Sequence, residues 1–281
     1  MPPKSPVLQV RDKQIDLSTP RIMGVLNATP DSFSDGGEFN EVESARGQIG
    51  LMISQGASII DVGGESTRPG SEPVSASQEI DRVGPILKEA IPQFPDMLFS
   101  IDTTKFKVAE EALKLGAHFV NDISGLQQEP RFASLCAKYN AGYILMHSQG
   151  QPKTMQDNPS YHDVINDLAA FFKKQIALAK QAALETIILD PGIGFGKTQE
   201  HNLTILKNIE QLRELGYPLL LGASRKSTIG KILNDRPVDD RLIGTIAVHY
   251  HAMMQGVRIL RVHDVKEAND SILVYNALNG S

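Results

Sequence analysis

The stretch Leu98–Asp122, with the sequence LFSIDTTKFKVAEEALKLGAHFVND, holds one complete unit of a pattern that recurs along the chain. It begins with a short apolar run, Leu98–Ile101, and continues with Lys105–Leu115, where apolar residues recur every three or four positions. Gly116 and a second apolar run, Phe119–Asp122, complete the unit. A spacing of three and four predicts an amphipathic helix, and short continuous apolar runs predict strands covered on both faces. The stretch therefore predicts a strand, a helix and a second strand of a parallel sheet.

The same alternation repeats throughout the sequence. Eight short apolar runs predict strands, at Ile22–Leu26, Ile59–Val62, Leu98–Ile101, Phe119–Asp122, Gly142–Met146, Ile187–Leu189, Pro218–Leu221 and Ile259–Val262. Amphipathic runs such as Tyr161–Ala183 and Asn202–Leu215 predict helices between them. Four of the predicted helices end at a glycine, which tolerates the left-handed backbone found there: Gly56, Gly116, Gly216 and Gly256. Eight such units predict an α/β fold of the (β/α)8 TIM-barrel class, and Val7–Leu17 predicts a short N-terminal β-hairpin before it.

A doubly wound open sheet is the competing architecture. It would normally carry a glycine-rich dinucleotide turn after its first strand. In this chain that turn reads Asn27-Ala28-Thr29-Pro30-Asp31. The turn and the number of predicted strands both favour the barrel.

Bulk composition narrows the class of protein further. The chain has 281 residues, 41% of them hydrophobic, and we expect one barrel domain over residues 1–281 because such barrels hold about 250 residues. The net charge of −5 argues against a dedicated nucleic-acid binder, which usually has a basic face. No segment approaches the roughly 20 apolar residues of a membrane span, and Met1–Pro6 does not resemble a signal peptide. We expect a cytoplasmic protein with no membrane or nucleic-acid partner, whose single cysteine, Cys136, is buried in a helix.

Polar residues occur at the end of every predicted strand. In barrel enzymes the active site lies at the C-terminal ends of the strands. A single Asp or Asn there is more often a helix cap or a turn former, and a single Arg or Lys is usually a solvated surface charge. Eight coincident polar endings favour a functional rim instead, and they include Asn27, Asp61, Asp102, Asn121, His147, Asp190, Lys226, Arg261 and His263.

The residue types on this rim divide into two groups. Asp102, Asn121 and Asp190 offer carboxylate oxygens and an amide, which suit a flat heterocycle bound by its hydrogen-bonding edge. Lys226, Arg261 and His263 follow the last two predicted strands, where barrels commonly bind anions. The run Ser224–Ser227 also opens a predicted helix, and the N–H groups at a helix start favour anions. The rim therefore predicts a heterocycle site beside an anion site.

Several other segments resemble functional motifs but lack residues that those motifs require. Gly194–Thr198 resembles the end of a phosphate-binding P-loop, but Pro191 occupies the position of its first glycine. His249 and His251 do not share one helical face, and no Cys/His set has zinc spacing. No Gly-x-Ser-x-Gly sequence marks a hydrolytic serine.

Two long motifs carry a family resemblance. They are Met23–Gly37 (MGVLNATPDSFSDGG) and Asp61–Gly70 (DVGGESTRPG). Further matching segments follow in the expected order, at Asp102, Asn121–Asp122, Asp190–Lys197, Ser224–Ser227 and Arg261–His263. On these segments the sequence, over about residues 21–278, resembles the bacterial dihydropteroate synthase family, folate-pathway enzymes that sulfonamides target. The one departure is Ala28, where valine is common, and we do not expect it to disturb the chemistry.

The resemblance implies a reaction and a set of site residues. The reaction joins the dihydropterin-6-ylmethyl group of a pterin diphosphate to the amine of p-aminobenzoate, which yields dihydropteroate and pyrophosphate. The implied pterin-binding residues are Asp102, Asn121, Met146, Asp190, Gly222 and Lys226. The implied diphosphate-binding residues are Asn27, Arg68, Arg261 and His263, and the implied p-aminobenzoate-binding residues are Thr67, Pro69, Phe195 and Ser227. Asp102, Asp190 and Lys226 would be catalytic, Asn27 would coordinate Mg²⁺, sulfonamides would compete as ligands, and the family is usually homodimeric.

A mechanism follows from this chemistry as a hypothesis. Diphosphate leaves readily only when its developing charge is stabilised, which Mg²⁺, Arg261 and His263 would do. We hypothesise a dissociative substitution in which the C–O bond breaks first and Asp102 helps to stabilise the methylene cation. No enzyme nucleophile is then required. We also expect the loops Thr29–Gly37 and Glu65–Glu72 to be mobile and to order over the bound diphosphate.

Two alternatives remain beside this interpretation. A methyltetrahydrofolate–corrinoid methyltransferase is a related pterin-binding barrel. That enzyme binds no diphosphate, so it would not require the two segments Ser224–Ser227 and Thr67–Gly70. A non-catalytic pterin-binding protein could retain Asp102, Asn121 and Asp190 while losing the anion-binding residues, which are present here.

Overall fold

Parallel strands and helices alternate along the chain in the computed structural model, which describes residues 6–28, 37–65, 74–150 and 154–280. The strands are β1 (Val7–Val10), β2 (Lys13–Asp16), β3 (Arg21–Asn27), β4 (Ile59–Gly63), β5 (Leu98–Asp102), β6 (Phe119–Asp122), β7 (Gly142–Met146), β8 (Ile187–Asp190), β9 (Leu220–Leu221) and β10 (Ile259–Val262). The α-helices are α1 (Gly37–Ser54), α2 (Ala76–Gln93), α3 (Phe106–Leu115), α4 (Phe132–Lys138), α5 (Val164–Gln181), α6 (Gln199–Asn208), α7 (Ser227–Ile232), α8 (Leu242–Met254) and α9 (Val265–Asn279). Two 3-10 helices are η2 (Ile209–Leu215) and η3 (Val238–Asp240).

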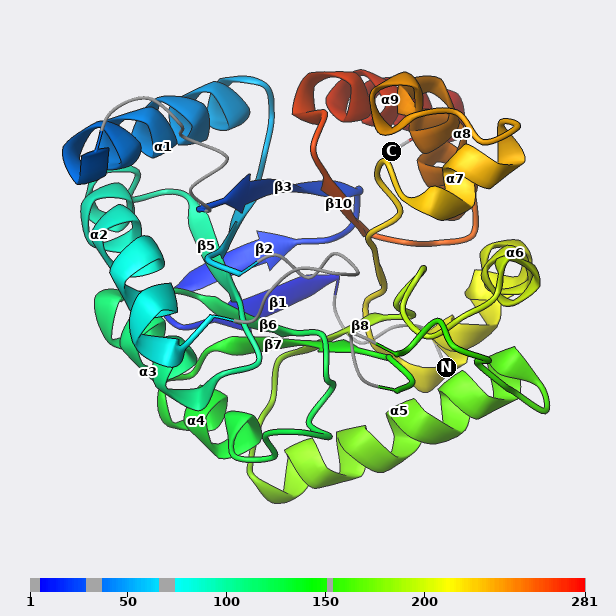
Figure 1. Cartoon of the computed structure of the whole chain (residues 1–281), viewed down its shortest axis with the longest axis horizontal. Coiled ribbons are helices and arrows are strands. Elements are labelled where there is room, and N and C mark those ends of the chain that lie inside the picture. The colour runs from blue at the N-terminus through cyan, green and yellow to red at the C-terminus, as the bar shows by residue number, and fades with distance from the viewer. Residues whose placement is uncertain (1–5, 29–36, 66–73, 151–153, 281) are drawn as a thin grey trace.

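The parallel strands close into a barrel. Their hydrogen-bonded order is β8-β7-β6-β5-β4-β3-β10-β9, and β8 meets β9 where the Leu189 N–H donates to the Pro218 carbonyl at 2.9 Å. Figure 1 looks into the resulting ring, with the helices arranged around its outside. The predicted TIM barrel is confirmed, and so is the N-terminal hairpin, because β1 and β2 pair antiparallel ahead of it.

The hairpin closes one end of the barrel. Val10, Ile15 and Leu17 from the hairpin region join a buried cluster with interior residues of the barrel strands. The hairpin also bonds to residues that precede strands: the Arg11 guanidinium donates to the Ala117 carbonyl at 3.1 Å, and the Thr186 hydroxyl donates to the Gln9 carbonyl at 2.6 Å. It therefore seals the N-terminal end of the barrel and leaves the C-terminal end as the open rim.

Strand and helix positions agree with the sequence pattern except at two places. The predicted strand Pro218–Leu221 is reduced to β9: Pro218 has no N–H to donate to a neighbouring strand, and Leu219 forms only an isolated parallel bridge with Leu189. The predicted helix Asn202–Leu215 is divided between α6 and the 3-10 helix η2. The four predicted helix-ending glycines all have positive φ. Among the described residues, no helix combines the length and apolar character needed to cross a membrane.

Candidate active site

Inside the barrel, a layer of polar side chains lies next to a layer of apolar ones, on the side of the C-terminal rim. Ile59, Phe119, Ile188 and Ile259 belong to the apolar cluster inside the barrel. Since successive side chains on a strand point to opposite faces, the residue two positions later also points inward. On these four strands that rule selects Asp61, Asn121, Asp190 and Arg261. On β5 the apolar cluster contains Leu98, and Asp102, four positions later, lies on the same side of the strand; we call these five residues the polar layer.

Arg261 joins two carboxylates of the polar layer. Its Nε donates to Asp61 Oδ2 at 2.7 Å, and its Nη2 donates to Asp102 Oδ2 at 2.7 Å. Asn121 Nδ2 donates to the same Asp61 oxygen at 2.9 Å. A guanidinium has five N–H groups, so these two bonds leave Arg261 able to contact an anion as well. The network thus connects strands β4, β5, β6 and β10 at one level of the barrel.

The environment of Asp102 makes its carboxyl easier to protonate. Burial is the largest influence and raises the pKa of Asp102 to about 7. The Arg261 guanidinium opposes this shift, whereas the negative charge of Asp61 adds to it. The Asp102 carboxyl is therefore set to change charge near neutral pH, which is unusual for a group with an ordinary pKa near 4.

Lys226 and Asp190 form the other side of the site. The Lys226 ammonium donates to the Ile193 carbonyl at 2.6 Å and lies 4.6 Å from the centre of the Phe195 ring. Asp190 Oδ1 accepts the Gly192 N–H at 2.8 Å. Burial lowers the pKa of Lys226 to about 8 while Asp190 opposes the shift, and burial raises the pKa of Asp190 while Lys226 opposes it. The opposed shifts indicate two buried groups of opposite charge close to one another.

Gly222 and Met146 shape the space next to Asp190. A side chain at Gly222 would bring its Cβ to 3.7 Å from Asp190 Oδ2, so glycine keeps this space free. Met146 is buried and lies opposite Asp190 in the register of β7 and β8. Both residues are therefore neighbours of the predicted pterin-binding carboxylate.

Three further predicted ligand-binding residues, His263, Asn27 and Ser227, are exposed at the edge of the rim. His263 is exposed, with its Nδ1 3.0 Å from the Ser224 hydroxyl. Asn27 is an exposed residue at the end of β3, and Ser227 is the exposed first residue of α7. Thr67, Arg68 and Pro69, like most of the two predicted mobile loops, lie outside the described residues.

One buried group of residues was not assigned a role from the sequence. The Lys197 ammonium, with a side chain only 3% exposed, donates to the carbonyls of His147, Gly192 and Phe195 at 3.1, 2.9 and 3.0 Å. It also lies 3.0 Å from His147 Nδ1. Lys197 thereby holds the loop between β8 and α6, which includes Phe195 and the Ile193 carbonyl, against the end of β7. The sequence feature that could have indicated a role for Lys197 is its position directly after a glycine-rich loop.

Burial of Lys197 predicts a pH-dependent stability. Burial, the largest influence, lowers the pKa of Lys197 to about 7 from the ordinary value of 10.5. Between these values the unfolded chain binds a proton that the folded chain lacks, so the free energy of unfolding increases as the pH rises, by up to about 1.4 kcal/mol per pH unit. Urea unfolding at pH 7, 8 and 9 should show this increase, and Lys197→Met should reduce it. The exposed Lys173→Met is the control, and equal slopes in all three proteins would contradict the prediction.

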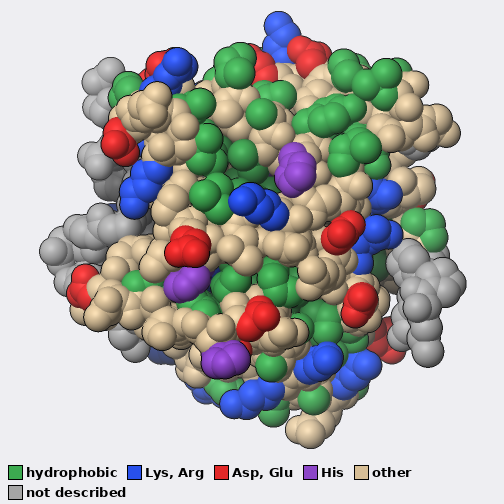
Figure 2. Space-filling view, turned by 90° about the vertical axis from the view of Figure 1, so that its right-hand side faces the viewer, with side chains coloured by type: hydrophobic (Ala, Val, Ile, Leu, Met, Phe, Trp, Pro, Cys, Tyr) green, Lys and Arg blue, Asp and Glu red, His purple; other side chains and the backbone are tan. Residues whose placement is uncertain are grey.

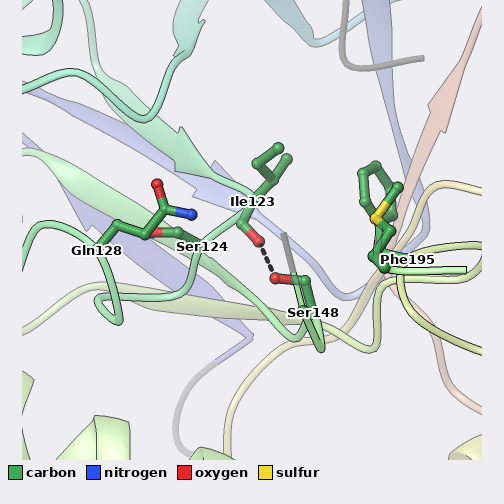
Figure 3. Close-up of a pocket in the computed structure, with 7 residues that line it drawn as sticks. Ile123, Ser124, Gln128, Ser148 and Phe195 are labelled. Atoms are coloured by element: carbon green, nitrogen blue, oxygen red, sulfur yellow. Dashed lines mark hydrogen bonds between the residues drawn. The ribbon is translucent and has the colours of Figure 1, made fainter. Parts of the chain in front are cut away.

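A small cavity lies beside this loop. Its volume is about 10 Å³, and its lining includes Ile123, Ser148 and Phe195 (Figure 3). The Ser148 hydroxyl donates to the Ile123 carbonyl at 2.8 Å across one side of it. A cavity of this size holds no more than a water molecule, so it is too small to be the substrate site.

The polar layer lies at the C-terminal rim of a (β/α)8 barrel, which is where enzymes of this fold have their active sites. A family model described as "Pterin binding enzyme" matches residues 23–263, which is most of the chain. Dihydropteroate synthase of Synechocystis sp. is 49% identical over 259 residues, which cover 92% of this chain and 89% of that protein. The chain belongs to the dihydropteroate synthase family and is a transferase.

Solved structures agree with this assignment. A Yersinia pestis dihydropteroate synthase in a sulfonamide drug complex is 44% identical, with a TM-score of 0.91, and the match covers 98% of this chain and 100% of that one. A Xanthomonas albilineans dihydropteroate synthase with 4-aminobenzoic acid is 36% identical, again with a TM-score of 0.91, and the match covers 99% of this chain and 100% of that one.

Proposed function

We propose that this enzyme condenses 6-hydroxymethyl-7,8-dihydropterin diphosphate with p-aminobenzoate to give 7,8-dihydropteroate and pyrophosphate. The observation that carries the proposal is the division of the rim into two chemical halves. Asp102, Asn121 and Asp190 supply carboxylates and an amide for a heterocycle, and Arg261 and Lys226 supply positive charge beside them. A single substrate that joins a pterin ring to a diphosphate uses both halves at once.

The proposed chemistry is a dissociative substitution. The C–O bond to the diphosphate breaks, the bonding electron pair leaves with pyrophosphate, and the amine of p-aminobenzoate then attacks the methylene carbon and loses a proton. Asp102 carries the negative charge that stabilises the intervening cation when its carboxyl is ionised, and Lys226 and Arg261 face the departing negative charge. Because no enzyme nucleophile takes part, trapping a covalent pterin–enzyme adduct during turnover would contradict this mechanism.

The residues present fit a magnesium ion that binds together with the substrate. Mg²⁺ prefers oxygen ligands and is often held by one or two protein groups together with substrate phosphates. Asn27 offers an amide oxygen at the exposed end of β3, and the described residues contain no group of three or more His, Cys, Asp or Glu side chains that could hold a metal by themselves. We therefore propose Asn27 as the protein ligand. When bound, the ion would neutralise charge on the diphosphate.

The p-aminobenzoate half of the proposal depends on the loop after β8. Phe195 is half-buried beside Lys226, and Ser227 is exposed at the start of α7, so both border the open rim. The solved relatives with 4-aminobenzoic acid and with a sulfonamide drug support the same ligands for this chain. We include Thr67 and Pro69 in this pocket, and sulfonamides as competitors for it.

Pyrophosphate release with each component omitted in turn tests the proposed function. We expect release that requires the pterin diphosphate, p-aminobenzoate and Mg²⁺ together. A sulfonamide should inhibit it competitively with p-aminobenzoate. Equal release without p-aminobenzoate would indicate a hydrolase and would contradict the proposed condensation.

We further propose that the enzyme is a homodimer formed through α8 and α9. These helices pack together, with the Tyr250 and Tyr275 rings 6.1 Å apart. Five exposed large hydrophobic residues lie on them: Ile243, Met254, Leu273, Val274 and Leu278. Figure 2 shows hydrophobic side chains gathered in the upper part of this side of the molecule, where Figure 1 places both helices. An exposed apolar area of this kind commonly marks a protein interface.

We also propose a cytoplasmic location, with which the free, buried Cys136 is consistent.

Charge substitutions on this face test the dimer. Ile243 is 79% exposed and Leu278 is 72% exposed, so changing both to Glu should leave the folded chain intact while placing charges in the interface. We expect the double variant to elute as a monomer, with its molar mass measured by light scattering. Leu51→Glu, at a 55% exposed position on α1, is the control and should remain dimeric. A dimeric double variant would rule out this face.

A further inference from the structure

One fully buried carboxylate contacts both halves of the site without reaching the surface. Asp61 has an exposed fraction of 0%, and its Oδ2 accepts hydrogen bonds from both Asn121 and Arg261. Its other oxygen, Oδ1, is buried and has no hydrogen-bond partner among the described residues. A carboxylate this deeply buried is stabilised by its bonds to a cation and an amide, so it has a strong influence on where those two groups lie.

The bond from Asn121 determines which way its amide faces. A carboxylate only accepts hydrogen bonds, so the Asn121 nitrogen must face Asp61. The amide oxygen is thereby turned away from Asp61. Without this acceptor, the amide of Asn121 could rotate by half a turn and exchange its donor and acceptor ends.

The bond from Arg261 determines the orientation of its planar fork. Nε donates to Asp61, and Nη2 of the same plane donates to Asp102. Two carboxylates on neighbouring strands therefore each bond to one nitrogen of the guanidinium. Removing Asp61 would leave the Asp102 bond alone, and a single bond does not fix the plane of a guanidinium.

We propose that Asp61 is a positioning residue that aligns Asn121 for the heterocycle and Arg261 for the diphosphate through one shared oxygen. This inference rests on the proposed function, because it assigns the two halves of the substrate to these two side chains. Asp61 acts through its partners, since its own carboxylate is fully buried.

The test measures two ligands separately by equilibrium binding. The probes are 6-hydroxymethyl-7,8-dihydropterin, which lacks the diphosphate, and magnesium pyrophosphate. Asp61→Asn should weaken the binding of each probe by about tenfold or more, because it removes the negative charge that holds the Arg261 guanidinium, and because an uncharged amide can turn either its oxygen or its N–H group toward Asn121 and Arg261. Asn121→Ala should weaken the dihydropterin much more than pyrophosphate.

The matched control is a second buried carboxylate. Glu79 also has an exposed fraction of 0% and an oxygen without a described partner, but it bonds to Lys105 instead of the polar layer. Glu79→Gln should leave both affinities within about twofold, which separates positioning from a general loss of stability. If Asp61→Asn binds both probes normally while Asn121→Ala loses the dihydropterin, the proposed function stands and the role of Asp61 is wrong. If the unmodified enzyme binds neither probe, the proposed function itself fails.

A structural measurement covers the case in which Asp61→Asn does not fold. In a crystal structure of the unmodified enzyme with both probes bound, Asn121 Nδ2 and Arg261 Nε should remain within hydrogen-bonding distance of Asp61. Loss of either bond in the complex would overturn the proposal.

Discussion

Lys226→Ala is expected to lower kcat/KM for the pterin diphosphate by about 100- to 1000-fold, comparable to removing one preorganised donor from an active site. The Lys226 ammonium faces the Ile193 carbonyl and the Phe195 ring, and its charge offsets that of the buried Asp190. Its removal leaves Asp190 without its largest stabilising charge and takes one cation from the anion-binding half. Both substrate affinity and turnover should therefore fall.

Steady-state kinetics over a range of pH would measure this effect. Because the pKa of Lys226 is lowered to about 8, its positive charge is lost as the pH rises through 8, and kcat/KM of the unmodified enzyme should fall there. Lys226→Arg should move that fall to higher pH. Lys231→Ala is the control, because Lys231 is an exposed lysine on helix α7, which begins directly after Lys226. A near-normal kcat/KM for Lys226→Ala would remove Lys226 from the site.

Gly192→Ala is expected to have the largest effect on stability, of about 4 kcal/mol in the free energy of unfolding. Gly192 has a φ of +67°, and a Cβ there would lie 2.0 Å from the His147 carbonyl oxygen, which is far inside van der Waals contact. The same residue donates to Asp190 and accepts from Lys197. Movement of the backbone to relieve the clash would disturb both bonds, so activity should fall together with stability.

A second glycine provides a control that distinguishes the cost of the steric clash from the cost of the backbone conformation. Gly216 has a φ of +78°, but a Cβ there would have no atom within 4 Å. Gly216→Ala should therefore cost only about 1 kcal/mol, the penalty of the left-handed conformation alone. Urea unfolding of both variants measures the two costs. Equal losses would show that the contact with His147 contributes nothing.

Local pattern was sufficient for most of the fold. The unit Leu98–Asp122 has its strand, helix and second strand where apolar spacing predicted them, because each element in a barrel buries a regular face against its neighbours. The differences at Pro218 and in η2 arise where a missing N–H or a tighter helical turn changes the hydrogen bonding without changing the apolar pattern. The spacing of apolar residues does not predict such local changes.

The candidate site was only partly predictable. Residues at strand ends, such as Asp102 and Asp190, follow from the rule that barrel sites lie at the C-terminal rim. The sequence placed Asp61 on the rim and Lys197 in the loop after Asp190, but neither position indicated which groups each residue would bond to. Their roles depend on which other elements surround them.

By itself, the sequence determined the order of strands and helices, the rim on which polar residues gather and the division of that rim into a heterocycle half and an anion half. These properties depend on residue type and on short-range periodicity. Only the tertiary structure decided that Arg261 bonds to Asp61, 200 positions away, and to Asp102, 159 positions away, and that Lys197 is enclosed by carbonyl groups. The physical reason is that closure of the barrel brings its last strand beside its first ones, and the resulting distances and burial set the charges and hydrogen bonds of the site.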